Sequence, residues 1–232
     1  ARQLLKYQDL AGINKINHKA TLTPTNDQPV VRMNRDTYYS FATVNVSKGA
    51  YISMPEIRKG YYMTVEPVSE GHRVQAMFYG NGKFNLTTHT GDHIVLVIRL
   101  DARFTLAEKA EIQSKMKIVA NANEKFTTEQ INHESFEKVE TALKRKIVQV
   151  ITDEPLMALQ GMFTSPLDGS GELHNQHKYE VGAAVGWGGA QWDDNIYEID
   201  FPRSANACYQ LTFEDPKNKA FWSFTVYDGK GF

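Results

Sequence analysis

The sequence predicts a mainly β protein with a helical connector, in which two antiparallel β domains of sandwich or jelly-roll character flank the helices. Apolar residues alternate with period two between residues 30 and 102, which is the strand signal. The period becomes helical at Thr105, and strand-like alternation returns after residue 196. We therefore expect an N-terminal β domain, a helical connector and a C-terminal β domain at residues 1–104, 105–163 and 164–232.

In the N-terminal domain, alternation is clearest from Tyr38, from Val74 and from Ile94. Glycine- or asparagine-bearing turns such as Gly80-Asn81-Gly82 separate these runs, and such residues adopt a positive φ at low cost. The pattern predicts at least six strands in an antiparallel sheet or sandwich.

Two helices are predicted in the connector. Thr105 and Glu108 have the spacing of a capping box, which starts a helix that we expect to run to about Val119. A second helix should end at Pro155, because a stripe of apolar residues recurs at helical spacing before it. Its members are Phe136, Val139, Leu143, Ile147 and Val150.

The C-terminal region opens with a polar, glycine-rich stretch between residues 163 and 178, which predicts an exposed loop. Three alternating runs then predict strands, with Cys208 buried in one of them. They are Tyr197-Ile199-Phe201, Tyr209-Leu211-Phe213 and Trp222-Phe224-Val226. The turn at Asp228-Gly229 has almost no chain after it. Either the sequence is cut short, or that edge is paired differently.

Composition limits the function. Of the 232 residues, 26 are Lys or Arg and 27 are Asp or Glu, so the net charge is −1 and no basic field favours a nucleic-acid partner. The aliphatic run Ile94–Ile98 is far shorter than the ~20 residues that cross a bilayer. We expect a soluble protein without a membrane span. A single cysteine leaves the compartment open between cytoplasm, periplasm and secretion.

Common catalytic signatures are missing from the sequence. It contains no G-x-S-x-G, no G-x-x-x-x-G-K-[ST], no G-x-G-x-x-G and no H-E-x-x-H, and no cofactor is predicted. His89, Asp92 and His93 could supply three metal ligands across one turn. Turn chemistry explains Gly91 and Asp92 without a metal, so none is assigned.

The densest polar string begins at Arg32. If this stretch is extended, Arg32, Asn34 and Asp36 share one face, and Arg35 points to the other side. One interpretation is a buried Arg–Asp pair that fixes the start of a strand; the other is a pocket for an anion or a sugar-sized ligand. Trp187, with three glycines around it, fits either the core or the lining of a cleft.

Together these segments resemble the paired domain-of-unknown-function families 1254 and 1214. Gly12-Ile13-Asn14 with His18, the string from Val31 to Ser40, His72 and Phe78–Gly82 resemble the first family; Gly182–Gly189 with Tyr197 and Ala220–Tyr227 resemble the second. The resemblance implies two β domains with helices between them, and a chain that continues past Phe232. It implies no settled reaction.

Our leading hypothesis is a small-molecule site at the junction of the two β domains. The substrate-binding candidates are Arg32, Asn34, Arg35, Trp187 and Tyr227. His72 is the first catalytic candidate, because an ordinary histidine titrates near neutral pH, and Asp36 is the second. Hydrolysis is the expected reaction.

The rival hypothesis is a non-catalytic β module for assembly or carbohydrate binding. In that case the polar string locks the fold, and an exposed C-terminal edge recruits another subunit, which includes the possibility of a homo-oligomer. The sequence leaves open whether the protein is an enzyme.

Overall fold

The computed structural model describes residues 1–24, 33–153, 162, 175–191, 194–196, 202–204, 206–218 and 220–226. Its helices are α1 (Arg2–Ala11), α2 (Leu106–Lys115), α3 (His133–Arg145), α4 (Ile147–Asp153) and α5 (Gln176–Val185). Its strands are β1 (Ile16–His18), β2 (Thr37–Asn45), β3 (Ala50–Met54), β4 (Met63–Ser69), β5 (Phe78–Tyr79), β6 (Gly82–Leu86), β7 (His93–Asp101) and β8 (Lys117–Ala120).

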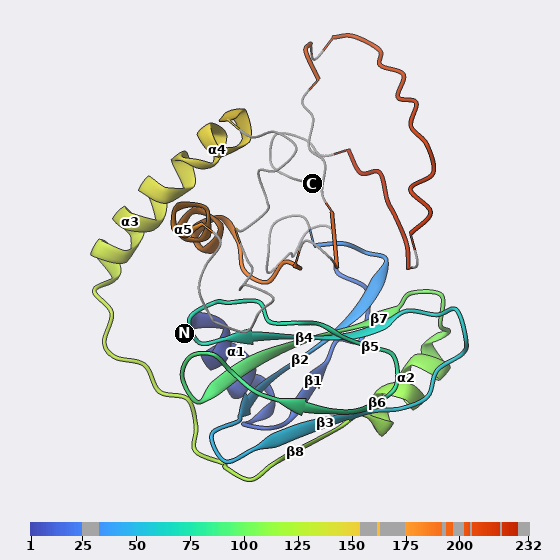
Figure 1. Ribbon diagram of the computed structural model, residues 1–232, viewed down its shortest axis with the longest axis vertical. Helices are drawn as coiled ribbons and strands as arrows, with labels where there is room; N and C mark the ends of the chain where they lie inside the picture. Colours follow the sequence, from blue (N-terminus) through green and yellow to red (C-terminus); the bar gives the residue numbers. More distant parts are fainter. Residues whose placement is uncertain are drawn as a thin grey trace.

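The strands form two antiparallel sheets that face one another across a common core (Figure 1). The larger sheet has the order β1-β2-β7-β4-β5, and the smaller has the order β6-β3-β8. This arrangement confirms the mainly β fold class. The six strands expected between residues 30 and 102 are present, although around Val74 only a single bridge to Val68 forms.

The period-two pattern places one face of the larger sheet in this core. Ala42 pairs with Leu96 and Val44 pairs with Ile94, and all four side chains are buried on the inner face. Ile52 of β3 meets them from the opposite sheet. The residues between these positions point to the outer face, because successive side chains alternate along a strand.

The outer face of the larger sheet is covered by α1 and a second hydrophobic cluster. Tyr7 of α1 stacks on Phe41 of β2 with ring centroids 4.4 Å apart. Gln8 fixes the helix to the chain after β8, since its amide nitrogen donates to the Phe126 carbonyl and its amide oxygen accepts from the Phe126 N–H. This face therefore contains apolar packing near α1.

The first connector helix, α2, begins at the predicted capping box between Thr105 and Glu108. The prediction that it continues to Val119 is wrong, because the helix ends at Lys115 and Met116 is extended. Residues 117–120 form β8, which pairs with β3 and completes the smaller sheet. Burial of Met116 in the core and pairing with β3 outweigh the local helical tendency.

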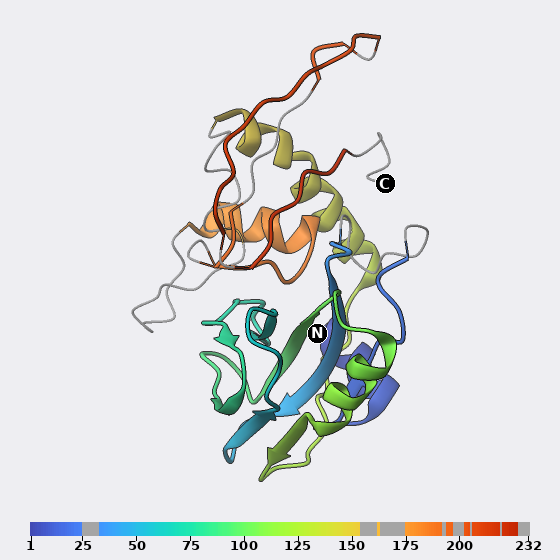
Figure 2. The same cartoon turned by 90° about the vertical axis from the view of Figure 1, so that its right-hand side faces the viewer.

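The remaining helices form a separate layer, with α5 packed beside α3 and α4 (Figures 1 and 2). Val150 and Val181 are buried in the contact between α4 and α5. Helix α5 was not predicted from the sequence, and the expectation of a loop up to residue 178 is wrong from Gln176 onward. Asn175 starts this helix by accepting a hydrogen bond from the Lys178 N–H. Residues 163–174 lie outside the described residues.

The late alternating runs do not form strands within the described part of the chain. Residues 208–213 and 221–226 have no ladder pairing among the described residues, and Figure 1 shows this red part of the chain on the opposite side of the view from α3 and α4. Phe213 packs edge-on against Trp222, yet both are about half exposed. Cys208 is exposed rather than buried. The run from Tyr197 to Phe201 lies outside the described residues, and the three-part domain division stays a prediction.

No helix in the described ranges has both the length and the apolar character needed to span a bilayer.

Candidate functional site

A row of polar side chains crosses the outer face of the larger sheet. The strand register places Tyr39 opposite Arg99, Arg99 opposite Thr64 and Thr64 opposite Tyr79. Directly opposed residues point to the same face of an antiparallel sheet. These four side chains therefore lie side by side across β2, β7, β4 and β5, from a buried tyrosine to a half-exposed one.

The neighbouring row contains a buried glutamate. Glu66 is opposite Val97, which is opposite Phe41. The Glu66 carboxylate is fully buried, and its Oε2 lies 2.6 Å from Nη1 of Arg99, whose side chain is 12% exposed. Burial raises the pKa of Glu66, and the Arg99 charge opposes that rise. A buried charge is costly even when it is paired, so this ion pair is weak evidence for stability alone.

The other oxygen of this carboxylate, Oε1, is buried without a hydrogen-bond partner among the described residues. Gly188 lies directly above it: a Cβ on this glycine would be 4.0 Å from Oε1. Gly188 has a φ of +73°, a left-handed conformation that favours glycine. The glycines around Trp187 thus allow the backbone to approach the buried glutamate closely.

The covering segment, residues 186–191, is fixed to the sheet at both ends. Trp187 packs on Tyr7 and Phe41, with ring centroids 5.9 and 6.0 Å away. Gln191 donates a hydrogen bond to the Val74 carbonyl. The indole Nε1 of Trp187 is buried, and it too lacks a hydrogen-bond partner in the described part of the chain. Trp187 is therefore both a core residue and a neighbour of the buried carboxylate.

The open side of the site is lined by aromatic rings and a second carboxylate. The Tyr79 hydroxyl donates a short hydrogen bond to Asp194. Burial raises the pKa of Tyr79, and this hydrogen bond raises it further. Phe221 packs edge-on against Tyr62, which directly precedes β4 and lies within range of the charges of Glu66, Arg99 and Asp194. Three distant parts of the chain thus meet at one face of the sheet.

The predicted polar string leads into β2 through a turn. Asn34 Oδ1 accepts hydrogen bonds from the Asp36 N–H and from the Thr37 hydroxyl, which shapes the turn into β2. Arg35 and Asp36 are exposed, so the buried Arg–Asp pair is wrong. Met33 packs on the same hydrophobic cluster as Trp187, which brings the string near the covering segment. Arg32 and Tyr227 lie outside the described residues.

His72 lies beyond the end of β4, in a turn that contacts α5. Its ring is 6.3 Å from that of Tyr179, whose hydroxyl donates to the Gly71 carbonyl. Ser69 is three residues past Glu66, which is about 10 Å along a strand. Burial lowers the pKa of His72 to about 4, so the ring is neutral at pH 7. At that pH the ring is a weak base and cannot act as an imidazolium acid.

The three candidate metal ligands do not converge. His93 is buried, with Nδ1 3.1 Å from Glu70 Oε1 and Nε2 2.9 Å from the Glu124 carbonyl oxygen. His89 and Asp92 are exposed. Across the described ranges no group of three His, Cys, Asp or Glu side chains could hold a metal ion. Glu70 instead holds the turn into β7, since it also accepts from the backbone N–H groups of Asp92 and His93.

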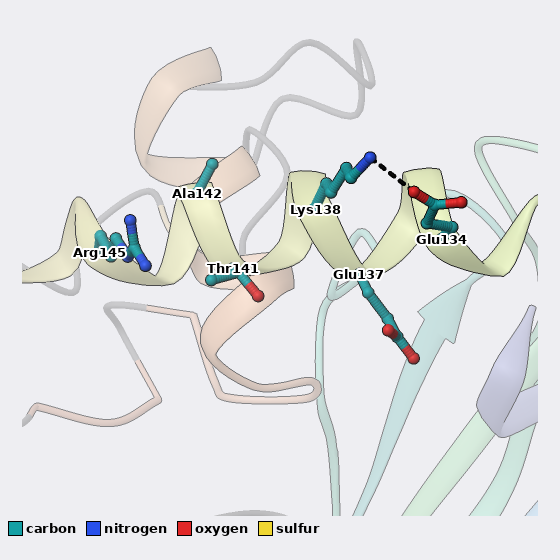
Figure 3. A pocket seen from close by; sticks show the side chains of 6 residues that line it. All are labelled: Glu134, Glu137, Lys138, Thr141, Ala142 and Arg145. Atoms are coloured by element: carbon teal, nitrogen blue, oxygen red, sulfur yellow. Dashed lines mark hydrogen bonds and ion pairs between the residues drawn. The ribbon is translucent and has the colours of Figure 1, made fainter.

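A shallow hollow on α3 is not a good candidate (Figure 3). All of its lining residues come from one helix: Glu134, Glu137, Lys138, Thr141, Ala142 and Arg145. The ion pair drawn there, between Lys138 and Glu134, is exposed and joins residues one turn apart. Such pairs are typical of a solvated helix surface and contribute little.

Glu66 and Arg99, which carry the site, were not predicted from the sequence. A signal was present, because Glu66 is the only charged residue in MTVEPVS, and Arg99 follows the apolar run of HIVLVIRLD, whose other charged residue, Asp101, ends the strand. A charge is rarely buried unless it is paired. Two such strands in one sequence therefore favour a buried ion pair, although the pattern cannot show that the strands are adjacent.

The fold and this buried pair define a β-sandwich protein with a covered polar face. Residues 13–76 match the model of a family described as a protein of unknown function, DUF1254. This match includes Asn34, Glu66 and His72 but ends before Arg99. The predicted resemblance of the C-terminal segments to family 1214 stays a prediction.

A solved structure is similar to part of the chain at low sequence identity. No curated protein matches the chain. The chain is similar to the crystal structure of a protein from Vibrio parahaemolyticus, with 12% sequence identity and a TM-score of 0.46 over 68% of this chain. It spans 58% of the length of that chain.

Proposed function

We propose that the protein binds a small molecule on the outer face of the five-stranded sheet, at the Glu66–Arg99 pair and beneath residues 186–191. The observation that carries this proposal is the fully buried Glu66 carboxylate, whose Oε1 has no hydrogen-bond partner among the described residues. Leaving such an atom unsatisfied costs about 1–3 kcal/mol, and more for a charged group. Buried polar groups of this kind favour a binding role.

The predicted substrate-binding residues fit this site to different degrees. Trp187 lies beside it and supplies an indole N–H and an apolar ring. Asn34 and Arg35 precede β2, whose Tyr39 belongs to the polar row. Their roles, and those of Arg32 and Tyr227, are part of the proposal.

We further propose that the bound molecule is hydrolysed at this site. His72 is the first candidate for the general base, although burial lowers its pKa to about 4 and so makes the neutral ring a weak base at pH 7. Asp36 is the second candidate, on the exposed side of the turn into β2. Replacement of His72 by Asn would abolish hydrolysis of any substrate found for this site, whereas binding of that substrate would remain.

The binding proposal is tested with a diverse fragment library and two double variants. Glu66→Gln/Arg99→Met removes both buried charges. Glu111→Gln/Lys115→Gln removes an exposed ion pair on α2 and is the matched control. Fragments that bind only the folded state raise its melting temperature. We expect hits that stabilise the parent and the control but not the first variant. Equal stabilisation of all three proteins, or no hit at all, would contradict the proposal.

A second candidate function is assembly, and one observation favours it. The extended segments 208–213 and 221–226 expose alternating apolar side chains, among them Leu211 at 57% and Val226 at 77%. Exposed apolar strands favour pairing with another chain. This candidate predicts self-association of the parent in sedimentation analysis and a monomer after Leu211→Lys/Phe224→Lys. A monomeric parent at high concentration would rule it out.

A further inference from the structure

We infer that the Glu66–Arg99 site takes a ligand that presents a hydrogen-bond donor, a hydroxyl or an ammonium group, and that it rejects carboxylate ligands. The inference rests on the proposed function, and it names the chemical class of the ligand at that same site. The sequence-based hypothesis allowed an anionic or a hydroxylated ligand, and this inference retains only the hydroxylated one and adds an ammonium group.

The charge already present at the site disfavours an anion. The Arg99 guanidinium is paired with the Glu66 carboxylate, and Asp194 adds a second carboxylate on the open side. Close to Tyr62, Asp101 is paired with Arg103 and adds no net charge. The described groups around the site thus hold one negative charge in excess. A like charge placed against them is unfavourable, and a cation is favoured.

The hydrogen-bonding capacity that is left at the site favours a donor. An ionised carboxylate only accepts hydrogen bonds, so Glu66 Oε1 requires a donor. The Trp187 indole only donates, and its N–H is buried without a partner among the described residues. A hydroxyl group can donate to Glu66 and can also accept a hydrogen bond from a donor such as an indole N–H. An ammonium group can satisfy Glu66 alone, and a carboxylate cannot satisfy it.

The aromatic lining favours an organic ligand. Trp187 precedes Gly188, which approaches the buried carboxylate. Tyr62, which packs edge-on against Phe221, lies within range of the Glu66 and Arg99 charges. Faces of such rings attract cations and pack well on apolar carbon. The site therefore favours an organic ligand with a donor group over an inorganic ion.

The test is a matched series on one skeleton: 2-phenylethanol, 2-phenylethylamine and phenylacetate. Dissociation constants are measured by calorimetry at pH 7 and low salt for the parent protein and for Asp194→Asn. This variant keeps an oxygen acceptor for Tyr79 but removes a charge. Asp153→Asn on exposed α4 is the matched control.

We expect the alcohol or the amine to bind at least tenfold more tightly than the acid. Asp194→Asn should weaken amine binding about threefold or more and leave alcohol binding unchanged, whereas Asp153→Asn should change neither. Preferential binding of phenylacetate would overturn the ligand class while leaving the binding site in place. Failure of all three compounds to bind would also overturn the ligand class, and the fragment library would then decide the proposed function separately.

Discussion

Glu66 and Arg99 lie on adjacent strands of the same sheet and form a 2.6 Å ion pair that is almost wholly removed from solvent. The register puts Arg99 opposite Thr64, two residues before Glu66 on the same face of β4, so the guanidinium reaches across diagonally to Oε2. The other carboxylate oxygen, Oε1, is buried without a hydrogen-bond partner among the described residues. The buried Glu66 carboxylate is therefore paired through one oxygen only, among the described residues.

Glu66→Gln should destabilise the protein strongly, because it leaves the Arg99 charge buried opposite a neutral amide. Loss of one partner of a buried ion pair costs about 3–5 kcal/mol. Chemical denaturation measures the change in the free energy of unfolding. The double variant Glu66→Gln/Arg99→Met should recover most of the loss, since no uncompensated charge remains. Equal losses in the single and double variants would show that the pair has no such coupling.

Stability should fall as the pH is lowered from about 6.5 to 4. In the folded state burial lowers the pKa of His72 to about 4, whereas the unfolded chain takes up the proton near pH 6.5. The unfolded state therefore binds more protons in this window, and up to about 3 kcal/mol of stability is lost across it.

His72→Asn should reduce this pH dependence, because asparagine does not titrate and tolerates the positive φ of 62° at this position. A smaller slope should persist from His18, whose pKa is lowered by burial and by Lys109. Denaturation curves at pH 7, 5.5 and 4.5 measure the effect. An unchanged slope in His72→Asn would contradict the assigned pKa.

Gly91→Ala should be more harmful than Gly80→Ala, although both glycines have a φ of +72°. At Gly80 no atom lies within 4 Å of the place that a Cβ would occupy, so only backbone strain of about 1–2 kcal/mol is expected. At Gly91 a Cβ would overlap the Glu70 carboxylate, which holds the turn into β7 through three hydrogen bonds. Similar melting temperatures for the two variants would refute this role of Glu70.

Thr105→Ala should cost about 1 kcal/mol, because it removes the side-chain cap of α2. Thr105→Ser retains the hydroxyl and should cost much less. Thermal unfolding of both variants gives the comparison. Loss of equal size in the serine variant would mean that the methyl group, rather than the cap, stabilises this end of the helix.

The elements that sequence predicts well are those whose local signal agrees with their final environment. Thr105 begins α2 because the capping box is satisfied within four residues, and the period-two runs of β2 and β7 face a true core. The runs near Tyr209 and Trp222 have the same period but no partner strand among the described residues, so alternation alone did not produce a sheet. The prediction of where α2 ends was wrong because Met116 is buried in the core by residues distant in the sequence.

The candidate site was predictable only in part. Its residues come from different strands, and the register of strand pairing brings them together. Trp187 was singled out by its glycines, and the structure places it beside the site. Arg35 and Asp36 were predicted as site residues because charged residues are dense in that stretch. Dense charge is also typical of an exposed turn, and both residues are exposed. Glu66 and Arg99 are more informative, because Glu66 is the only charge in β4 and Arg99 follows a run of five apolar residues in β7. Only the pairing of β4 with β7 brings them together.

The most direct test of the account uses the indole N–H of Trp187 as a reporter. The protein has three tryptophans, so a two-dimensional nitrogen–proton NMR spectrum shows three indole signals, and Trp187→Phe assigns the relevant one. Titration with a fragment that stabilises the parent protein should shift the Trp187 signal saturably, and the shift should vanish in Glu66→Gln/Arg99→Met. If saturating fragment leaves the Trp187 signal in place, the ligand does not bind beside the buried carboxylate and the central claim is wrong.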